Sequence, residues 1–113
     1  MATDIRAHLK YLSISAQKVR LVLDMVRGKP AVEALNMLKY LPNKAAADVS
    51  KLLASAVANA EENFGVSRDD LYVYELTADE GPTRKWRRFG ARGRFKPVLR
   101  RSSRVTVVLR ERA

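Results

Sequence analysis

GPTRKWRRFGARGRFKPVLRRSSR, residues 81–104, is the stretch that decides the shape of this protein. Ten of its 24 residues are Lys or Arg, and none is Asp or Glu. A structureless connection of more than about 15 residues is uncommon in a compact domain, and such a connection is usually functional or disordered. The flanking segments LYVYELTA (residues 71–78) and RVTVVLR (residues 104–110) are rich in β-branched and aromatic residues, which predicts strands on both sides. The sequence therefore predicts one long β-ribbon with its turn in GARG, residues 90–93.

Such a ribbon would project from the rest of the molecule. At about 3.3 Å per residue, an arm of roughly 18 residues extends on the order of 60 Å, whereas the radius of gyration expected for a chain near this length is about 13 Å. An isolated two-stranded ribbon is only marginally stable in water, and one this basic repels itself. We therefore expect the hairpin extension, approximately residues 79–104, to be held in shape by a polyanion.

The N-terminal segment predicts a third strand. Ile5, Ala7, Leu9 and Tyr11 alternate with polar or charged residues, which is the period-two pattern of a strand with one buried face. His8 is the single histidine and falls on the polar face, so we expect it to be an ordinary surface residue. Together with the two strands that flank the basic segment, this strand predicts a short antiparallel sheet.

Three amphipathic helices are predicted between these strands. The first follows Ser15, a favourable N-cap residue, and has Gly28 at its exit; the second has Pro30 in its first turn. The third covers residues 44–63, whose apolar residues fall on one stripe, and ends before Gly65. The predicted order is β-α-α-α-β-β. We expect an α+β fold in which three helices pack on a short antiparallel sheet as a single domain, residues 1–113, from which the long basic β-hairpin protrudes.

The positive charge lies almost entirely in the last third of the chain. Residues 1–80 contain 10 Lys or Arg and 11 Asp or Glu, whereas residues 81–113 contain 12 and one. The formal net charge of +10 indicates a polyanionic partner. Ten of those 12 basic residues are Arg, whose planar guanidinium binds phosphate bidentately and stacks on bases. Because Trp86, Phe89 and Phe95 are interleaved among them, the segment favours RNA, which displays unpaired bases.

Several other kinds of protein are disfavoured by what the sequence lacks. It contains no cysteine for a disulfide, a thiolate metal site or a nucleophile. It also has no GxxxxGK or HExxH motif, and His8 would have to serve alone as a base, so we expect no enzyme, no metal and no cofactor. No window approaches the roughly 20 apolar residues of a membrane span. We expect a cytoplasmic protein with no membrane partner and, in the absence of a dedicated apolar face, no homo-oligomer.

Four stretches of the chain match motifs of a known family. They are SISAQKVRLVLDMVRGKPAVEAL (residues 13–35), ASAVANAEEN (54–63), DEGPTRKWRRFGARGR (79–94) and SSRVTVVL (102–109). In this order, and over nearly the whole chain, they resemble the bacterial large-subunit ribosomal protein twenty-two family. The resemblance implies a small α/β domain on the outer face of the large subunit. It also implies a β-hairpin that threads through ribosomal RNA, with its tip in the wall of the nascent-peptide exit tunnel.

The resemblance also implies which residues act. Those implied to contact RNA are in the first helix and along the hairpin: Ser15, Lys18, Arg20, Arg27, Lys29, Arg84, Lys85, Arg87, Arg88, Arg100 and Arg101. Those implied to form the hairpin tip at the exit tunnel are Phe89, Gly90, Ala91, Arg92, Gly93 and Arg94. The implied role is a structural constituent that supports subunit assembly. Its implied partners are large-subunit ribosomal RNA, neighbouring ribosomal proteins and the nascent polypeptide, on a ribosome of bacterial or organellar type.

The chain departs from the family pattern at three places near the tip. Trp86 stands where a basic residue is expected, Phe89 where proline is common, and Gly90 where arginine is common. These departures affect the local backbone of the tip and the side chains that face the tunnel.

Residues alone leave other classes of protein open. One is an architectural DNA-binding protein whose basic β-arm enters the minor groove. Another is a membrane-surface module that uses Arg and Trp at an anionic interface, although TRKWRRFGARGRFKP shows no apolar stripe. The plainest alternative is a solvated, disordered basic segment. Tyr11, Tyr72 and Tyr74 could stack on bases, but tyrosines in strands over an alanine-rich helix lie more often in the core, and we expect that placement.

Overall fold

The computed structural model describes residues 4–81, 84–89 and 95–112, with side chains described for residues 4–81 and 101–112. The elements in chain order are β1 (Ile5–Leu12), α1 (Ala16–Val26), α2 (Ala31–Lys39), α3 (Lys44–Phe64), the short 3-10 helix η1 (Arg68–Asp70), β2 (Leu71–Glu80), β3 (Arg84–Phe89), β4 (Phe95–Arg100) and β5 (Ser103–Glu111). The predicted α+β class, with three helices on an antiparallel sheet, is confirmed.

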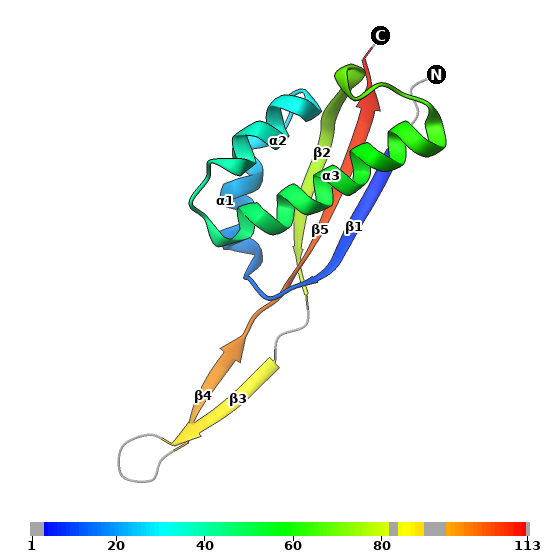
Figure 1. The fold of residues 1–113 in the computed structure, drawn as a ribbon. Helices are drawn as coiled ribbons and strands as arrows, with labels where there is room; N and C mark the ends of the chain where they lie inside the picture. The colour runs from blue at the N-terminus through cyan, green and yellow to red at the C-terminus, as the bar shows by residue number, and fades with distance from the viewer. Residues whose placement is uncertain (1–3, 82–83, 90–94, 113) are drawn as a thin grey trace.

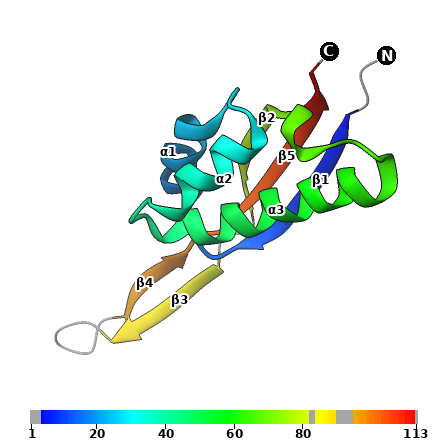
Figure 2. The same ribbon diagram turned by 45° about the horizontal axis from the view of Figure 1, so that its top comes forward.

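The main sheet has three antiparallel strands in the order β1-β5-β2. The helices cover one face of this sheet, and β3 and β4 extend away from one end of it, while both chain termini lie at the other end (Figures 1 and 2). None of the described helices lies on the opposite face of the sheet, which we call the open face (Figures 1 and 2). An antiparallel sheet tolerates such an arrangement because its side chains alternate between the two faces.

The core lies between the sheet and the helices. Fully buried residues line the inner side of α1, and others come from α3 and β5: Val19, Val22, Leu23, Val26, Val49, Leu53, Val57 and Val107. Four alanines of α3 are also buried, and their small side chains allow the helix to lie close to the strands. The helix ends at Phe64, and its C-cap residue Gly65 has a φ of 65°, the left-handed conformation that glycine adopts without strain.

A bulge in β1 reverses the expected side of Tyr11. Leu9 pairs with Val105 but Leu12 pairs with Ser103, so one extra residue lies on β1 between these pairs. Lys10 and Tyr11 are therefore both exposed, and Leu12 takes the buried position. The strict alternation predicted from the sequence holds only as far as Leu9.

A second bulge lies in β2. Val73 pairs with Leu109 and Glu75 with Val108, which leaves Tyr74 as the extra residue. Tyr74 is 41% exposed and Tyr72 is half-buried. The expectation that the strand tyrosines lie in the core was therefore wrong, because the core positions of this strand belong to smaller aliphatic residues.

The basic segment forms a separate two-stranded ribbon. β3 and β4 pair in an antiparallel register from Arg84 opposite Arg100 to Phe89 opposite Phe95. The last pair of the main sheet is Glu80 opposite Ser103, whereas the first pair of the ribbon is Arg84 opposite Arg100. The predicted ribbon is thus two paired segments with a one-residue offset between them. The predicted turn at residues 90–93 lies outside the described residues.

The hairpin makes the molecule elongated. Its principal extents are 64 × 25 × 18 Å and its radius of gyration is 17.2 Å, against about 13 Å for a compact chain near this length.

An arginine on the open face links β5 to β2 and to the residue that precedes β1, at the end opposite the hairpin. Arg110 of β5 donates from Nε to Oδ1 of Asp4 at 2.5 Å and from Nη2 to Oδ2 at 3.3 Å. Its guanidinium carbon lies 3.4 Å from the ring centroid of Tyr74 on β2, a cation–π contact. The hydrogen bond from Arg110 lowers the pKa of Asp4 below its ordinary value of 3.8.

Replacing Leu53 with Ala should lower the free energy of unfolding by about 2–5 kcal/mol, because a fully buried leucine leaves a cavity. Leu21→Ala is the matched control: Leu21 is 62% exposed on α1, and its loss should change stability by less than about 0.5 kcal/mol. Urea denaturation followed by circular dichroism measures both. Equal losses for the two variants would contradict the packing of α3 against the sheet.

The Asp4 carboxylate should stabilise the protein only where it is ionised. Its pKa is lowered in the folded state, so its contribution is present above the ordinary Asp value and is lost as the pH falls through the lower, folded-state value. Asp4→Asn should therefore reduce the urea midpoint at pH 7 but match the native protein near pH 2. Glu62→Gln, at an exposed residue of α3, is the control and should show no such pH-dependent difference. A deficit of Asp4→Asn that persists undiminished at pH 2 would rule out the ion pair as its cause.

Candidate nucleic-acid interface

The residues predicted to contact RNA fall in two places: the first helix with the turn that follows it, and the hairpin. Ser15 is the N-cap of α1, is half-buried, and makes no side-chain capping hydrogen bond. Lys18 on α1 and Lys29 in the turn are both exposed. Neither lysine has an ion pair within the described part of the chain, so both charges are available to a ligand.

Arg20 and Arg27 have a structural role that the sequence did not reveal. The Nε of Arg20 donates to the carbonyl oxygen of Ala78 at 3.0 Å, and the Nε of Arg27 donates to that of Leu76 at 2.7 Å. Both carbonyls belong to β2, which is an edge strand of the main sheet. An edge strand leaves carbonyl groups without a ladder partner, and the two arginines satisfy them while joining α1 to the strand.

The two arginines differ in what remains free for another ligand. Arg27 also forms an ion pair through Nη1 with Asp24, one turn earlier on α1. Arg20 has only its Nε engaged among the described contacts, so its two Nη groups can still bind phosphate. Arg27 is therefore foremost a structural residue, and Arg20 is suited to both roles.

The hairpin leaves the main sheet through a tightly packed neck, formed by Gly81 and Ser102. The amide of Gly81 donates to the carbonyl oxygen of Ser102 at 3.0 Å. A Cβ on Gly81 would lie 2.7 Å from Oγ of Ser102, so a larger residue would require the Ser102 side chain to move. Ser102 and Ser103 are both buried, whereas Arg101 beside them is exposed.

Along the hairpin, the described backbone gives the pairing of the predicted residues. The register places Arg84 opposite Arg100, Lys85 opposite Leu99, Arg87 opposite Pro97 and Arg88 opposite Lys96. Phe89 is the last residue of β3. The other predicted tip residues, Gly90, Ala91, Arg92, Gly93 and Arg94, lie outside the described residues.

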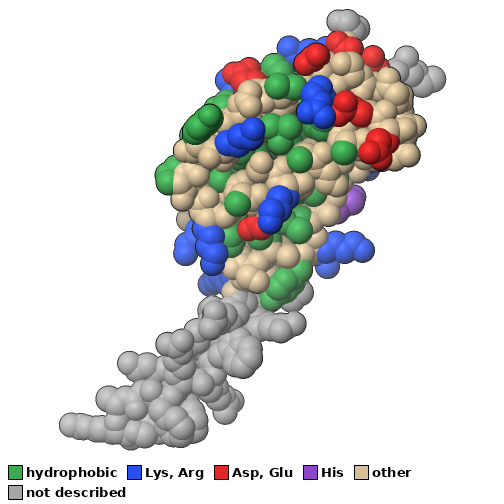
Figure 3. Space-filling model, viewed as in Figure 1, with side chains coloured by type: hydrophobic (Ala, Val, Ile, Leu, Met, Phe, Trp, Pro, Cys, Tyr) green, Lys and Arg blue, Asp and Glu red, His purple; other side chains and the backbone are tan. Residues whose placement is uncertain are grey.

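Charge is unevenly distributed over the globular part. On the face shown in Figure 3, most Asp and Glu side chains gather at the end away from the hairpin, whereas Lys and Arg side chains are spread over the face and include several near the base of the hairpin. The acidic residues at the end away from the hairpin include Glu61 and Glu62 in the last turns of α3, and Asp69 and Asp70 in η1. The negative charge on this face is therefore concentrated away from the hairpin (Figure 3).

Two other kinds of site receive no support from the described part of the chain. No described helix is long and apolar enough to cross a membrane. No group of three or more described His, Asp or Glu side chains is placed to hold a metal ion.

The fold and the charge distribution define a small α+β protein that carries a basic hairpin beyond its core. The family described as ribosomal protein L22p/L17e matches residues 7–110. A relative named large ribosomal subunit protein uL22 from Clostridium novyi (strain NT) is 49% identical over 97% of this chain and 99% of its own. Proteins of the same name from Thermoanaerobacter sp. (strain X514) and Caldicellulosiruptor saccharolyticus are 47% and 49% identical, over 96% and 94% of this chain and 98% and 87% of their own.

The chain therefore belongs to the ribosomal protein L22p/L17e family. This confirms the resemblance found in the four sequence motifs. Members of the family are structural proteins of the ribosome, so the protein is not an enzyme. The roles of the individual interface residues remain predictions.

Arg27→Ala should lower the free energy of unfolding by about 1 kcal/mol, the usual net contribution of a hydrogen bond, because the Leu76 carbonyl loses its partner. Lys18→Ala on the same helix removes one positive charge and no described hydrogen bond, so it should leave stability within about 0.5 kcal/mol of the native value. Urea denaturation of the free protein distinguishes the two. If both variants were equally stable, the contact between Arg27 and β2 would not hold α1 in place.

Proposed function

We propose that this protein binds the RNA of the large ribosomal subunit, supports the assembly of that subunit, and places its hairpin tip in the wall of the nascent-peptide exit tunnel. Its partners are then large-subunit ribosomal RNA, neighbouring ribosomal proteins and the nascent polypeptide, and it acts in the ribosomes of the cytoplasm. The relatives named above are called large ribosomal subunit proteins, and the similarity to this chain covers nearly their whole length. Both observations support this assignment.

The observation that carries the proposal is the opposition of like charges along the hairpin. Arg84 faces Arg100 and Arg88 faces Lys96 in the register of β3 and β4. Directly opposed like charges destabilise a strand pair, and a two-stranded ribbon has little stability to lose. A ligand that brings negative charge along the whole ribbon removes this repulsion. The phosphate backbone of folded RNA has this property.

The shape of the molecule agrees with a hairpin inserted into RNA and a core that stays outside. The longest extent of the molecule is 64 Å while the other two are 25 and 18 Å, an elongated shape that suits insertion of one end into RNA. The acidic end of the core lies away from the hairpin (Figure 3). Electrostatic repulsion between this end and phosphate favours the orientation with the hairpin inward.

Binding to large-subunit ribosomal RNA should weaken steeply with salt. With about 6–10 phosphates neutralised, the slope of log K against log salt should be about −4 to −9. The double variant Arg84→Ala/Arg88→Ala should make that slope shallower by about 1.4–1.8, since each lost phosphate contact removes about 0.7–0.9. Filter binding between 50 and 200 mM salt measures it.

The matched control is Arg68→Ala/Arg112→Ala, which removes two arginines outside the hairpin and should leave the slope unchanged. The variant Arg92→Ala/Arg94→Ala reports on the tip: an unchanged slope supports side chains that face tunnel water, and a reduced slope places them on phosphate instead. Equal affinity for duplex DNA and ribosomal RNA would contradict the proposal and favour an architectural DNA-binding protein.

A further inference from the structure

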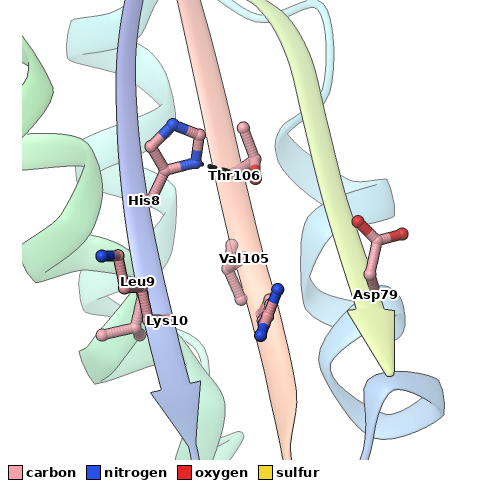
Figure 4. A pocket seen from close by; sticks show the side chains of 7 residues that line it. His8, Leu9, Lys10, Asp79, Val105 and Thr106 are labelled. Atoms are coloured by element: carbon pink, nitrogen blue, oxygen red, sulfur yellow. Dashed lines mark hydrogen bonds between the residues drawn. The ribbon is translucent and has the colours of Figure 1, made fainter. Parts of the chain in front are cut away.

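The open face of the sheet carries a hollow beside the base of the hairpin (Figure 4). Its polar lining comes from all three strands: His8 and Lys10 from β1, Arg104 and Thr106 from β5, and Asp79 from β2. We call it the open-face hollow. Three of its ionisable residues, His8, Lys10 and Arg104, are not among the residues of the helix and hairpin interface described above.

The strand pairing fixes which of these residues lie opposite one another. Arg104 lies directly opposite Asp79, and His8 lies directly opposite Thr106. A ring nitrogen of His8, Nδ1, is 3.2 Å from Oγ1 of Thr106 (Figure 4). Lys10 follows His8 by two residues on the exposed side of β1, next to the central strand. Since β5 is paired on both sides, the backbone of the hollow is already ordered before a ligand arrives.

The charges in the hollow are not neutralised by one another. Lys10 and Arg104 form no ion pair within the described part of the chain, although Asp79 occupies the position opposite Arg104. Elsewhere the protein pairs its arginines closely: Arg68 lies 2.7 Å from Glu61, and Arg110 lies 2.5 Å from Asp4. The hollow therefore offers two free cations and one free carboxylate to a ligand.

We propose that the open-face hollow binds the sugar–phosphate backbone of an RNA strand that continues from the base of the hairpin. Lys10 and Arg104 contact phosphate oxygens, to which ammonium and guanidinium groups donate strong hydrogen bonds. Asp79 would repel a phosphate, but its carboxylate accepts a hydrogen bond from a ribose 2′-hydroxyl, the group that distinguishes RNA from DNA. The proposal rests on the proposed function and extends it to a surface outside the hairpin.

The open-face hollow lies close enough to the hairpin for one RNA strand to contact both. Arg104 and Asp79 form the pair next to Glu80 and Ser103, which is the last pair of the main sheet. The neck follows immediately, with Arg101 exposed beside it. An RNA strand that leaves the hairpin along β4 would therefore meet Arg101 and then Arg104 on the way to Lys10.

The test uses the full chain with Lys10→Gln/Arg104→Gln, which removes both charges from exposed positions and keeps hydrogen-bonding side chains. The slope of log K against log salt for large-subunit ribosomal RNA should become shallower by about 1.4–1.8. Hydroxyl-radical protection should be lost at nucleotides different from those lost with Arg84→Ala/Arg88→Ala. The control Arg68→Ala/Arg112→Ala should show neither effect, and circular dichroism checks that each variant is folded.

The proposed role of Asp79 is tested by the preference of the same site for ribose over 2′-deoxyribose. RNA that carries 2′-deoxyribose at the nucleotides protected by the hollow should bind the native protein several-fold more weakly than unmodified RNA, and Asp79→Ala should bind both RNAs equally. If Asp79→Ala keeps the preference of the native protein, the role of the carboxylate is overturned.

The two levels of the proposal fail in different ways. If the native protein binds ribosomal RNA with a steep salt slope and Lys10→Gln/Arg104→Gln behaves like the control, the open-face hollow is not an RNA site, while the proposed function stands. If the native protein itself shows no salt-dependent binding to ribosomal RNA, the proposed function fails and this inference fails with it.

Discussion

The structure depends on the pairing of β5 with a strand on each side. β5 joins the N-terminal strand β1 to β2, and its inward residues Val105, Val107 and Leu109 are fully buried under the helices. The same strand begins at Ser103, where the hairpin neck ends. Because a strand paired on both sides has few free backbone groups and little freedom to move, β5 fixes the core on one face, the hollow on the other and the direction in which the hairpin leaves.

Two different sources of stability divide the molecule. The globular part carries nearly balanced charge and buries a continuous apolar core, which is the usual requirement for independent folding. In its described part the hairpin has two strands with basic residues at opposed positions, and no described helix packs on it (Figure 1). In the proposed function its stabilisation comes from phosphate, so folding of the core and ordering of the hairpin are separate events. The tightly packed neck at Gly81 and Ser102 lies between these two regions.

Arginine has several tasks in this protein, and its residue type alone does not distinguish them. Arg20 and Arg27 donate to the edge of β2, whereas Arg110 binds Asp4 and stacks on Tyr74. Each of these guanidinium groups is partly used inside the chain. Arg104, on the same strand as Arg110, has no such ion pair among the described contacts. A count of basic residues therefore overstates the number of charges that are free for RNA, and the contacts show which ones remain.

The sequence by itself determined the three helices, the three strands of the main sheet and the basic ribbon, because apolar periodicity, helix-ending glycine and charge are all read from neighbouring residues. It also carried the family motifs. Only the tertiary structure decided the bulges that expose Tyr11 and Tyr74, the structural use of Arg20 and Arg27, the interruption at the neck and the assembly of the hollow. The physical reason is distance along the chain. Arg20 and Arg27 meet their acceptors 58 and 49 residues away, and the hollow needs the register of three strands from opposite ends of the chain, which no local pattern contains.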